Sequence, residues 1–168
     1  MEGFCTQHHL MTYKEEDRMM DITCLDVEGV LVPEIWIAFA KASNIPELKK
    51  TTRDEPDYDK LMKWRLGILK EHGLGLKEIQ ETIAKIDPLP GAKEFLDELR
   101  TFSQVILISD TFTQFATPLM EKLGWPTLFC NTLEVAEDGE ITGFKMRVEQ
   151  SKLSTVKALQ SIGFDTIA

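Results

Sequence analysis

Residues 22–32 read Ile22-Thr23-Cys24-Leu25-Asp26-Val27-Glu28-Gly29-Val30-Leu31-Val32, with two acids between two apolar runs. The first run predicts a buried strand that delivers both carboxylates into a turn containing Gly29. Two acids one residue apart repel each other, and burial makes their charge more costly. A cation or a phosphoryl group at this point would explain both acids, whereas a helix cap at Asp26 beside a solvated Glu28 is the simpler alternative.

Length, charge and cysteine content narrow the class of protein. The 168 residues suit one domain with a small insertion, and the net charge of −9 disfavours nucleic acid or an anionic membrane as the main partner. No apolar run is long enough to span a bilayer. The odd number of cysteines, three without C-x-x-C spacing, favours a reducing compartment, and we therefore expect a cytoplasmic protein.

The first twenty residues differ from the rest of the chain. Residues 1–20 lack the apolar core of a secretory signal and contain several acids, which disfavours a transit peptide. We expect a disordered extension or a misplaced start, because Met19 and Met20 directly precede the first strand. A metal site at Cys5, His8 and His9 is an alternative, but chance is the better explanation of that cluster.

Beyond residue 33 the apolar pattern predicts helices near 34–43, 58–69, 76–86, 91–99, 112–123 and 151–162. Strands are predicted at 105–108, 127–130 and 164–168, with a hairpin inside 135–148 that turns at Glu137-Asp138-Gly139. This alternation predicts an α/β fold with a doubly wound, mainly parallel, Rossmann-like sheet. The helical block 33–87 interrupts the alternation and is predicted to be a cap inserted after the first strand, leaving 21–32 and 88–168 as the core domain.

Polar residues follow the ends of these predicted elements. Asp26 and Glu28 come after the first strand, Ser109 after the second, and Lys152 at the start of the last helix. Since ligands of a doubly wound sheet bind outside the carboxyl ends of its strands, these groups should meet at one rim. Phosphoryl transfer through an aspartyl-phosphate needs this set: a carboxylate nucleophile, an acid/base, a hydroxyl donor and a cation.

This constellation resembles the haloacid dehalogenase superfamily and, within it, the phosphoserine phosphatase branch. The resemblance extends from about Met20 to the last residue, and it is carried by the segments at 25–34, 107–112 and 151–152, which read Leu25-Asp26-Val27-Glu28-Gly29-Val30-Leu31-Val32-Pro33-Glu34, Leu107-Ile108-Ser109-Asp110-Thr111-Phe112 and Ser151-Lys152. It implies a Mg²⁺-dependent phosphatase of serine biosynthesis, acting on the small phosphomonoester phosphoserine through an aspartyl-phosphate.

The resemblance also implies a role for each core residue. Asp26 would be the nucleophile and a Mg²⁺ ligand, and Glu28 the general acid/base with its main-chain carbonyl on the metal. Ser109, Asp110 and Lys152 would bind the phosphoryl group.

In the predicted cap, the resemblance implies that Glu34 meets the substrate amino group and Arg65 its carboxylate. The planar fork of an arginine suits a carboxylate. From periodicity alone, Arg65 belongs to a solvated helix face and Lys152 to a solvated helix start. Lys157 competes with Lys152 for the phosphate role but lies a turn deeper in its helix.

Two features depart from the family pattern. Most relatives carry Asp in place of Glu28, and this difference resembles a sub-branch that also transfers the phosphoryl group to homoserine. The family's final acidic motif, G-D-x-x-N-D, follows the fourth strand, in which this sequence ends. We therefore expect a C-terminally truncated enzyme, with a truncated, non-catalytic member as the alternative.

A truncated sheet should expose apolar surface around Ile162, Phe164 and Ile167, so we also expect a poorly stable chain or a homodimer.

A phospho-acceptor receiver domain is a further alternative for the function of the chain. It too combines Asp, Ser/Thr and Lys on a doubly wound sheet, but it has no helical insertion after the first strand.

Overall fold

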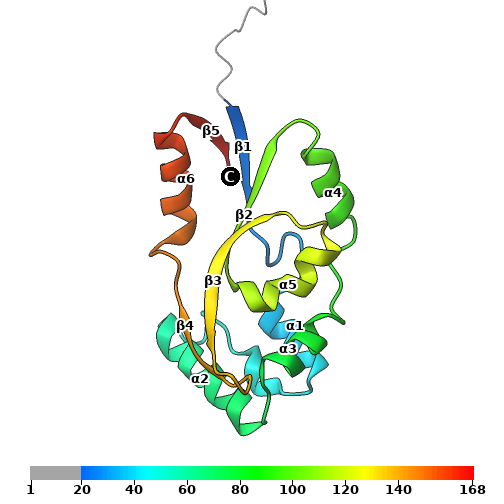
Figure 1. The fold of residues 1–168 in the computed structure, drawn as a ribbon, viewed down its shortest axis with the longest axis vertical. Coiled ribbons are helices and arrows are strands. Elements are labelled where there is room, and N and C mark those ends of the chain that lie inside the picture. Colours follow the sequence, from blue (N-terminus) through cyan, green and yellow to red (C-terminus); the bar gives the residue numbers. More distant parts are fainter. Residues whose placement is uncertain (1–19) are drawn as a thin grey trace, which may run out of the picture.

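The computed structural model describes residues 20–168, which form a five-stranded sheet with helices on both faces (Figure 1). The strand order is β4-β3-β2-β1-β5, and only β3 and β4 pair antiparallel. The strands are β1 (Met20–Leu25), β2 (Gln104–Phe112), β3 (Thr127–Val135), β4 (Ile141–Lys145) and β5 (Phe164–Ile167). The predicted doubly wound, mainly parallel sheet is confirmed. The predictions for residues 1–19 lie outside the described residues.

Successive side chains of the central strand β2 point to opposite faces of the sheet, because side chains alternate along a strand. Ile106 and Ile108 pack in a cluster with residues of α6 (Ser151–Ser161). Leu107, between them, belongs to a larger cluster that includes residues of α4 (Ala92–Leu99) and α5 (Thr113–Lys122). The continuous apolar run of β2 is therefore explained by burial on both sides.

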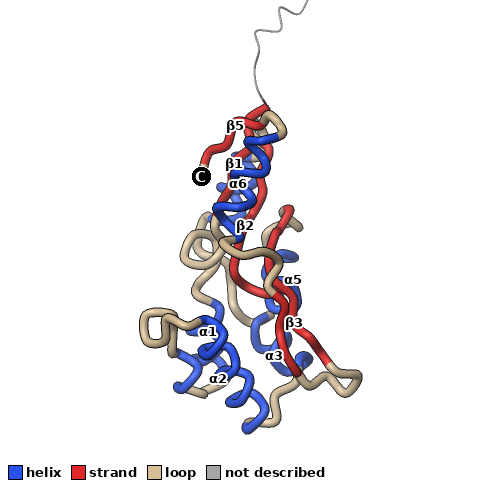
Figure 2. Tube along the Cα trace, turned by 90° about the vertical axis from the view of Figure 1, so that its left-hand side faces the viewer, coloured by secondary structure: helices blue, strands red, loops and turns tan. Residues whose placement is uncertain are grey.

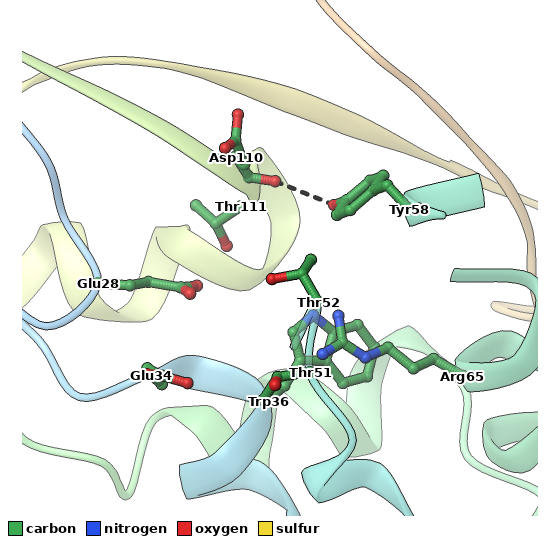
Figure 3. A pocket seen from close by; sticks show the side chains of 9 residues that line it. All are labelled: Glu28, Glu34, Trp36, Thr51, Thr52, Tyr58, Arg65, Asp110 and Thr111. Carbon is green, nitrogen blue, oxygen red and sulfur yellow. Dashed lines mark hydrogen bonds between the residues drawn. The ribbon is translucent and has the colours of Figure 1, made fainter. Parts of the chain in front are cut away.

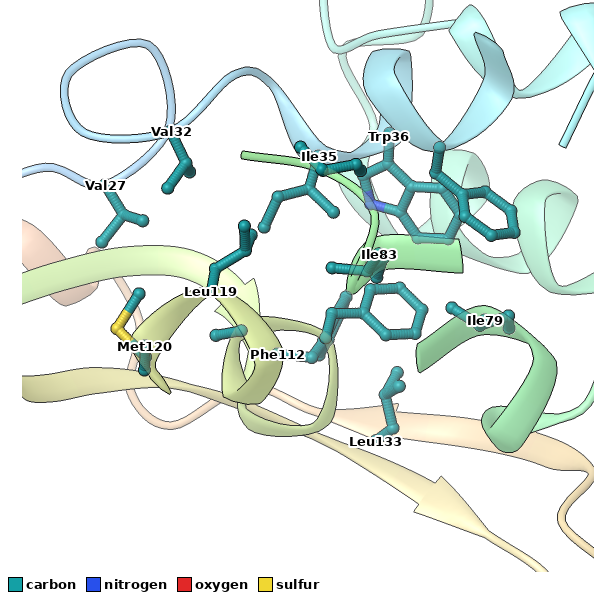
Figure 4. Close-up of a cluster of buried hydrophobic side chains, with 14 of the residues drawn as sticks. Val27, Val32, Ile35, Trp36, Ile79, Ile83, Phe112, Leu119, Met120 and Leu133 are labelled. Carbon is teal, nitrogen blue, oxygen red and sulfur yellow. The ribbon is translucent and has the colours of Figure 1, made fainter. Parts of the chain in front are cut away.

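The helices between β1 and α4 gather at the end of the molecule away from β5 (Figures 1 and 2). They are α1 (Ile35–Ala42), a 3₁₀ turn (Pro46–Lys49), α2 (Tyr58–Glu71) and α3 (Leu76–Ile83). Figure 4 shows Ile35 and Ile83 of this block beside Phe112 and Leu119 in one buried cluster. The division into a cap at 33–87 and a core remains a prediction, and the two parts share this apolar core.

Three element boundaries differ from the predicted ones by three residues or more. β2 was predicted to end at Ile108, but its extended backbone continues to Phe112, with an irregular register against β3 from Ile108 onward. α3 ends at Ile83, before Ile86, which nevertheless stays buried. β3 is longer than predicted because its second half pairs with β4. The predicted turn at 137–139 is confirmed, and Gly139 has a φ of 89° there.

The surface near the last strand is apolar, as predicted. Ile162 and Ile167 are 71% and 60% exposed, and Phe164 is partly buried. Among residues 20–168, no helix combines the length and the hydropathy that crossing a membrane would require.

Candidate active site

The Asp26 carboxylate is held at the end of β1 by a tight loop. Main-chain bonds from Leu31 N to Val27 O (2.9 Å) and from Gly29 N to Val32 O (2.7 Å) close the loop. Gly29 has a φ of 76°, in the left-handed region that favours glycine. The Val27 N–H donates to Asp26 Oδ1 at 2.8 Å. One carboxylate oxygen is therefore fixed by the loop itself.

The other oxygen of Asp26 meets the lysine predicted for the phosphoryl group. Lys152, the second residue of α6, donates from Nζ to Asp26 Oδ2 at 2.5 Å, across 126 positions of sequence. Both side chains are partly exposed, so this pair contributes little to the free energy of unfolding. Its value lies in placing a cation beside a carboxylate, as an aspartyl-phosphate site requires.

Glu28 lies in an environment that changes its protonation. Burial, and then the negative charge of Asp26, raise the pKa of the Glu28 carboxyl to about 7, while the charge of Arg65 opposes them. Near neutral pH this group both donates and accepts a proton. That property suits a general acid that later acts as a base.

Arg65 is buried rather than solvated, contrary to what periodicity alone favours. Its side chain lies over the Trp36 ring, with Cζ 4.4 Å from the ring centroid, and Nη2 donates to the Lys50 carbonyl at 2.7 Å. Burial lowers the pKa of Arg65 to about 10, so the group stays charged near neutral pH. Its Nε is buried without a hydrogen-bond partner in the described residues. A donor left in this state is suited to an anionic ligand.

The three residues of the predicted phosphate segment of β2 differ in burial: Ser109 and Thr111 are buried, whereas Asp110 is exposed. Ser109 is buried, and its Oγ accepts from the Thr111 N–H at 3.2 Å. The Asp110 residue is exposed, and its main-chain carbonyl accepts from Tyr58 Oη at 3.3 Å and from Asn131 Nδ2 at 2.9 Å. Since β1 pairs Leu25 with Leu107, Asp26 and Ser109 both lie at the carboxyl edge of adjacent parallel strands.

A cavity of about 210 Å³ connects this edge with the helical block (Figure 3). Four of the predicted site residues are among those that line it: Glu28, Glu34, Arg65 and Asp110. A neighbouring cavity of about 410 Å³ is lined by Lys152 and again by Asp110. Tyr58 lines both cavities, and its hydroxyl meets Asp110 between them. The lining residues of these two cavities include neither Asp26 nor Ser109.

Sequence reasoning missed several lining residues of the first cavity: Trp36, Thr51, Thr52, Tyr58 and Thr111. Position 58 enters the sequence prediction only as the first residue of the helix at 58–69. The Tyr58 hydroxyl donates a hydrogen bond to the main-chain carbonyl of Asp110, and such a contact cannot be predicted from residue types. A signal did exist for Trp36, because a tryptophan close to a predicted acidic ligand is a common wall of a small-molecule site.

The oxygen donors near Asp26 fit a Mg²⁺ ion only in part. Within residues 20–168, no three His, Cys, Asp or Glu side chains are grouped so as to hold a metal. Asp26 offers a carboxylate, and Glu28 is predicted to add its main-chain carbonyl. Since Mg²⁺ commonly keeps several waters and binds one or two carboxylates plus substrate phosphate oxygens, this pair suits a partial ligand set.

The raised pKa of Glu28 predicts how stability depends on pH when a chelator removes divalent cations. In the folded chain the Glu28 carboxyl keeps its proton up to about pH 7, whereas in the unfolded chain the same carboxyl releases its proton near pH 4.5. The stabilisation is therefore fully present below pH 4.5 and is lost as the pH rises through 7. At about 1.4 kcal/mol per pKa unit, the free energy of unfolding should fall by up to about 3.5 kcal/mol over this whole pH range.

Urea unfolding at pH 5.5 and pH 8 measures this effect. We expect Glu28→Gln to lose the pH dependence that Glu28 supplies, while Glu47→Gln, at an exposed glutamate of the 3₁₀ turn, keeps it. An equal pH dependence in wild type and Glu28→Gln would contradict the prediction.

The sequence is similar to named proteins of two Pseudomonas species. No family profile matches the chain. A phosphoserine phosphatase, ThrH, of Pseudomonas aeruginosa is 54% identical over 149 residues, which cover 89% of this chain and 73% of the relative. A phosphoserine phosphatase of Pseudomonas syringae pv. tomato is 51% identical over the same number of residues, covering 89% of this chain and 63% of the relative.

Solved structures show the same fold at lower identity. A phosphoserine phosphatase in its apo form has a TM-score of 0.66 and 22% identity, covering 86% of this chain and 72% of the other. A phosphoserine phosphatase that contains an analogue of the phospho-aspartyl intermediate also has a TM-score of 0.66 and 22% identity, covering 88% and 75%.

Proposed function

The chain belongs to the phosphoserine phosphatase branch of the haloacid dehalogenase superfamily, and we propose that it hydrolyses phosphoserine through a phosphorylated Asp26. The observation that carries the proposal is the surroundings of Asp26. Lys152 donates to its carboxylate, and Glu28, with a pKa of about 7, lies two residues away. A nucleophile, a cation and an acid/base are thereby available within one edge of the sheet.

In the proposed reaction, the Asp26 carboxylate attacks phosphorus, and the bond between phosphorus and the serine oxygen breaks. Glu28 donates a proton to the departing serine oxygen. Water then attacks the phosphorus of the aspartyl-phosphate while Glu28 takes a proton from it, which releases inorganic phosphate and restores Asp26. Lys152 and Ser109 would bind the phosphoryl oxygens, and the Asp110 segment would support them.

Mg²⁺ is the proposed metal, held by the Asp26 carboxylate and the Glu28 carbonyl with water in its other positions. When bound, it would offset the negative charge of the phosphoryl group and of Asp26.

Substrate choice is proposed to lie in the 210 Å³ cavity, where Glu34 and Arg65 would bind the amino and carboxylate groups of phosphoserine. The charged state of Arg65 and its unpartnered Nε support a carboxylate ligand. The cavity is small, as a single amino-acid phosphate requires.

Arg65→Ala is expected to lower kcat/KM for phosphoserine by about 100-fold, because a charged hydrogen bond in a buried site is worth about 1.5–3 kcal/mol. Hydrolysis of a generic aryl phosphate, which has no carboxylate, should change much less. Arg65→Lys should behave like Arg65→Ala, since it keeps the charge but loses the planar fork. Steady-state hydrolysis of both substrates measures the difference.

The matched control is Arg53→Ala, at an exposed arginine close to the cavity residues Thr51 and Thr52. It should leave both substrates unaffected. Equal losses on the two substrates in Arg65→Ala would assign Arg65 a structural role through its bond to the Lys50 carbonyl.

Homoserine is proposed as a second acceptor in place of water. The observation that favours it is the glutamate at position 28, together with Pro33-Glu34 and with Ser109-Asp110-Thr111 in the segment 107–112, which also resemble the sub-branch that transfers to homoserine. Adding homoserine to the phosphoserine assay distinguishes the two acceptors, because phosphohomoserine forms only by transfer. A non-catalytic member of the family is the alternative, and it would neither turn over phosphoserine nor phosphorylate Asp26.

A small phosphomonoester is the partner that this proposal requires, and a cytoplasmic location is proposed with it. The net charge of −9 supports the absence of nucleic acid among the partners. A homodimer is proposed from the exposed Ile162 and Ile167 near the sheet edge.

A further inference from the structure

The backbone of β2 leaves its regular pairing where the predicted phosphate segment begins. From Ile108 to Phe112 the strand advances four residues, while its partner β3 advances only two, from Phe129 to Asn131. The residues 109–111 therefore bulge from the ladder. A bulge re-aims main-chain groups next to many active sites, and those groups need partners elsewhere.

Asn131 supplies such a partner from β3. Its side chain is 1% exposed, and Nδ2 donates to the Asp110 carbonyl at 2.9 Å. Its Oδ1 accepts from the main-chain N–H of Arg147 at 2.9 Å. Because a main-chain carbonyl only accepts and an N–H only donates, these two partners fix the amide in one orientation. One buried side chain thus joins the bulge to the segment that precedes α6.

The second half of this connection leads to the lysine at Asp26. The Arg147 guanidinium donates from Nη2 to Ser151 Oγ at 3.0 Å and to Thr155 Oγ1 at 2.6 Å, and both hydroxyls lie on α6. Lys152, next to Ser151, donates to Asp26. A path of hydrogen bonds, continued by covalent bonds within Arg147 and from Ser151 to Lys152, therefore runs from the Asp110 carbonyl through Asn131 and α6 to the carboxylate.

We propose that Asn131 is a positioning residue, which sets the Ser109–Thr111 bulge and the Lys152 end of α6 at a fixed separation around Asp26. The proposal deepens the proposed function and rests on it for its catalytic consequence. Asn131 lines neither cavity itself, and it reaches the lining only through its bond to the Asp110 carbonyl, so it would act through the two segments that it joins. Their relative position matters because a displacement of about 1 Å in a catalytic constellation can lower the rate by about 100-fold.

Asn131→Leu tests the proposal, because it removes both hydrogen bonds at nearly constant size. The matched control is Gln114→Met. Gln114 forms an equivalent amide bridge to β3, donating from Nε2 to Leu133 O and accepting from Leu133 N, each at 3.0 Å, but it does not reach the Asp110 carbonyl. Thermal unfolding followed by circular dichroism establishes that both variants fold.

A carbodiimide, which couples only a carboxylate and an amine in contact, reports the Asp26–Lys152 pair without any need for activity. Mass spectrometry quantifies this cross-link relative to the Lys122–Asp87 pair, which lies 2.8 Å apart elsewhere in the fold. In Asn131→Leu the Asp26–Lys152 cross-link should fall about tenfold or more, because loss of each of the two buried hydrogen bonds is worth about 1 kcal/mol. In Gln114→Met it should stay at the wild-type level.

Kinetics provides the second measurement. Asn131→Leu should lower kcat for phosphoserine by about 100-fold and leave KM within about twofold, since the Glu34 and Arg65 contacts are untouched. An unchanged cross-link in Asn131→Leu, or an equal loss in Gln114→Met, would overturn the proposal. If the wild-type chain shows no turnover, the proposed function fails, and the cross-link still decides the role of Asn131.

Discussion

Asp26→Asn is expected to abolish formation of a phosphorylated enzyme and to lower phosphoserine turnover by about 10⁴-fold or more. The amide keeps the size of the carboxylate and accepts the Val27 N–H through its oxygen, so the loop should keep its shape. It loses the negative charge and the nucleophilic oxygen. The neutral side chain also withdraws the largest of the charges that raise the pKa of Glu28, which should therefore fall.

Two measurements test this expectation. Fluorine NMR detects the beryllium fluoride adduct, and in a separate experiment mass spectrometry locates the phosphoryl group of the phosphoenzyme. The adduct should form on wild type and not on Asp26→Asn. Asp21→Asn, at an exposed aspartate of the same strand β1, is the matched control and should trap fully. An intact adduct in Asp26→Asn would remove Asp26 from the nucleophile role and leave its contact with Lys152 as a structural ion pair.

The approach of Lys152 to Asp26 was accessible from the sequence, although 126 positions separate them. Each residue follows a recognisable apolar run or starts a helix, and the carboxyl edge of a parallel sheet brings such positions together. The same reasoning placed Ser109 on the neighbouring strand. Periodicity and chain order place these positions at that edge, whereas the choice of Lys152 over a solvated helix start came from the resemblance to the family.

The surroundings of Arg65 and Asp110 were not accessible in this way. Periodicity favours a solvated Arg65, yet the Trp36 ring and the Lys50 carbonyl enclose it. The contacts that Tyr58 and Asn131 make at the site go to the main-chain carbonyl of Asp110, which has no counterpart in residue identity. The bulge after Ile108 is likewise a tertiary feature, because it depends on how β3 aligns with β2. Packing and main-chain hydrogen bonds thus determine the part of the site that patterns do not predict.

Glu28→Gln is expected to lower kcat for phosphoserine by about 100- to 10,000-fold, the range of a lost general acid/base. The serine oxygen is a poor leaving group, and an amide has no acid proton to donate to it. The wild-type kcat/KM should fall as the pH rises above about 7, because Glu28 then loses the proton that the first step needs. Glu28→Gln should lack this limb of the pH profile.

An aryl phosphate with a good leaving group separates the two roles of Glu28. Its leaving group departs without a proton, so Glu28→Gln should still form the phosphoenzyme on Asp26. Water attack would then lack its base, and the variant should release one equivalent of phenol in a burst followed by slow turnover. Glu47→Gln, at an exposed glutamate outside both cavities, should show neither the burst nor the loss. A Glu28→Gln variant with wild-type turnover on both esters would show that the acid/base is another group, and the raised pKa of Glu28 would then reflect only its burial beside Asp26.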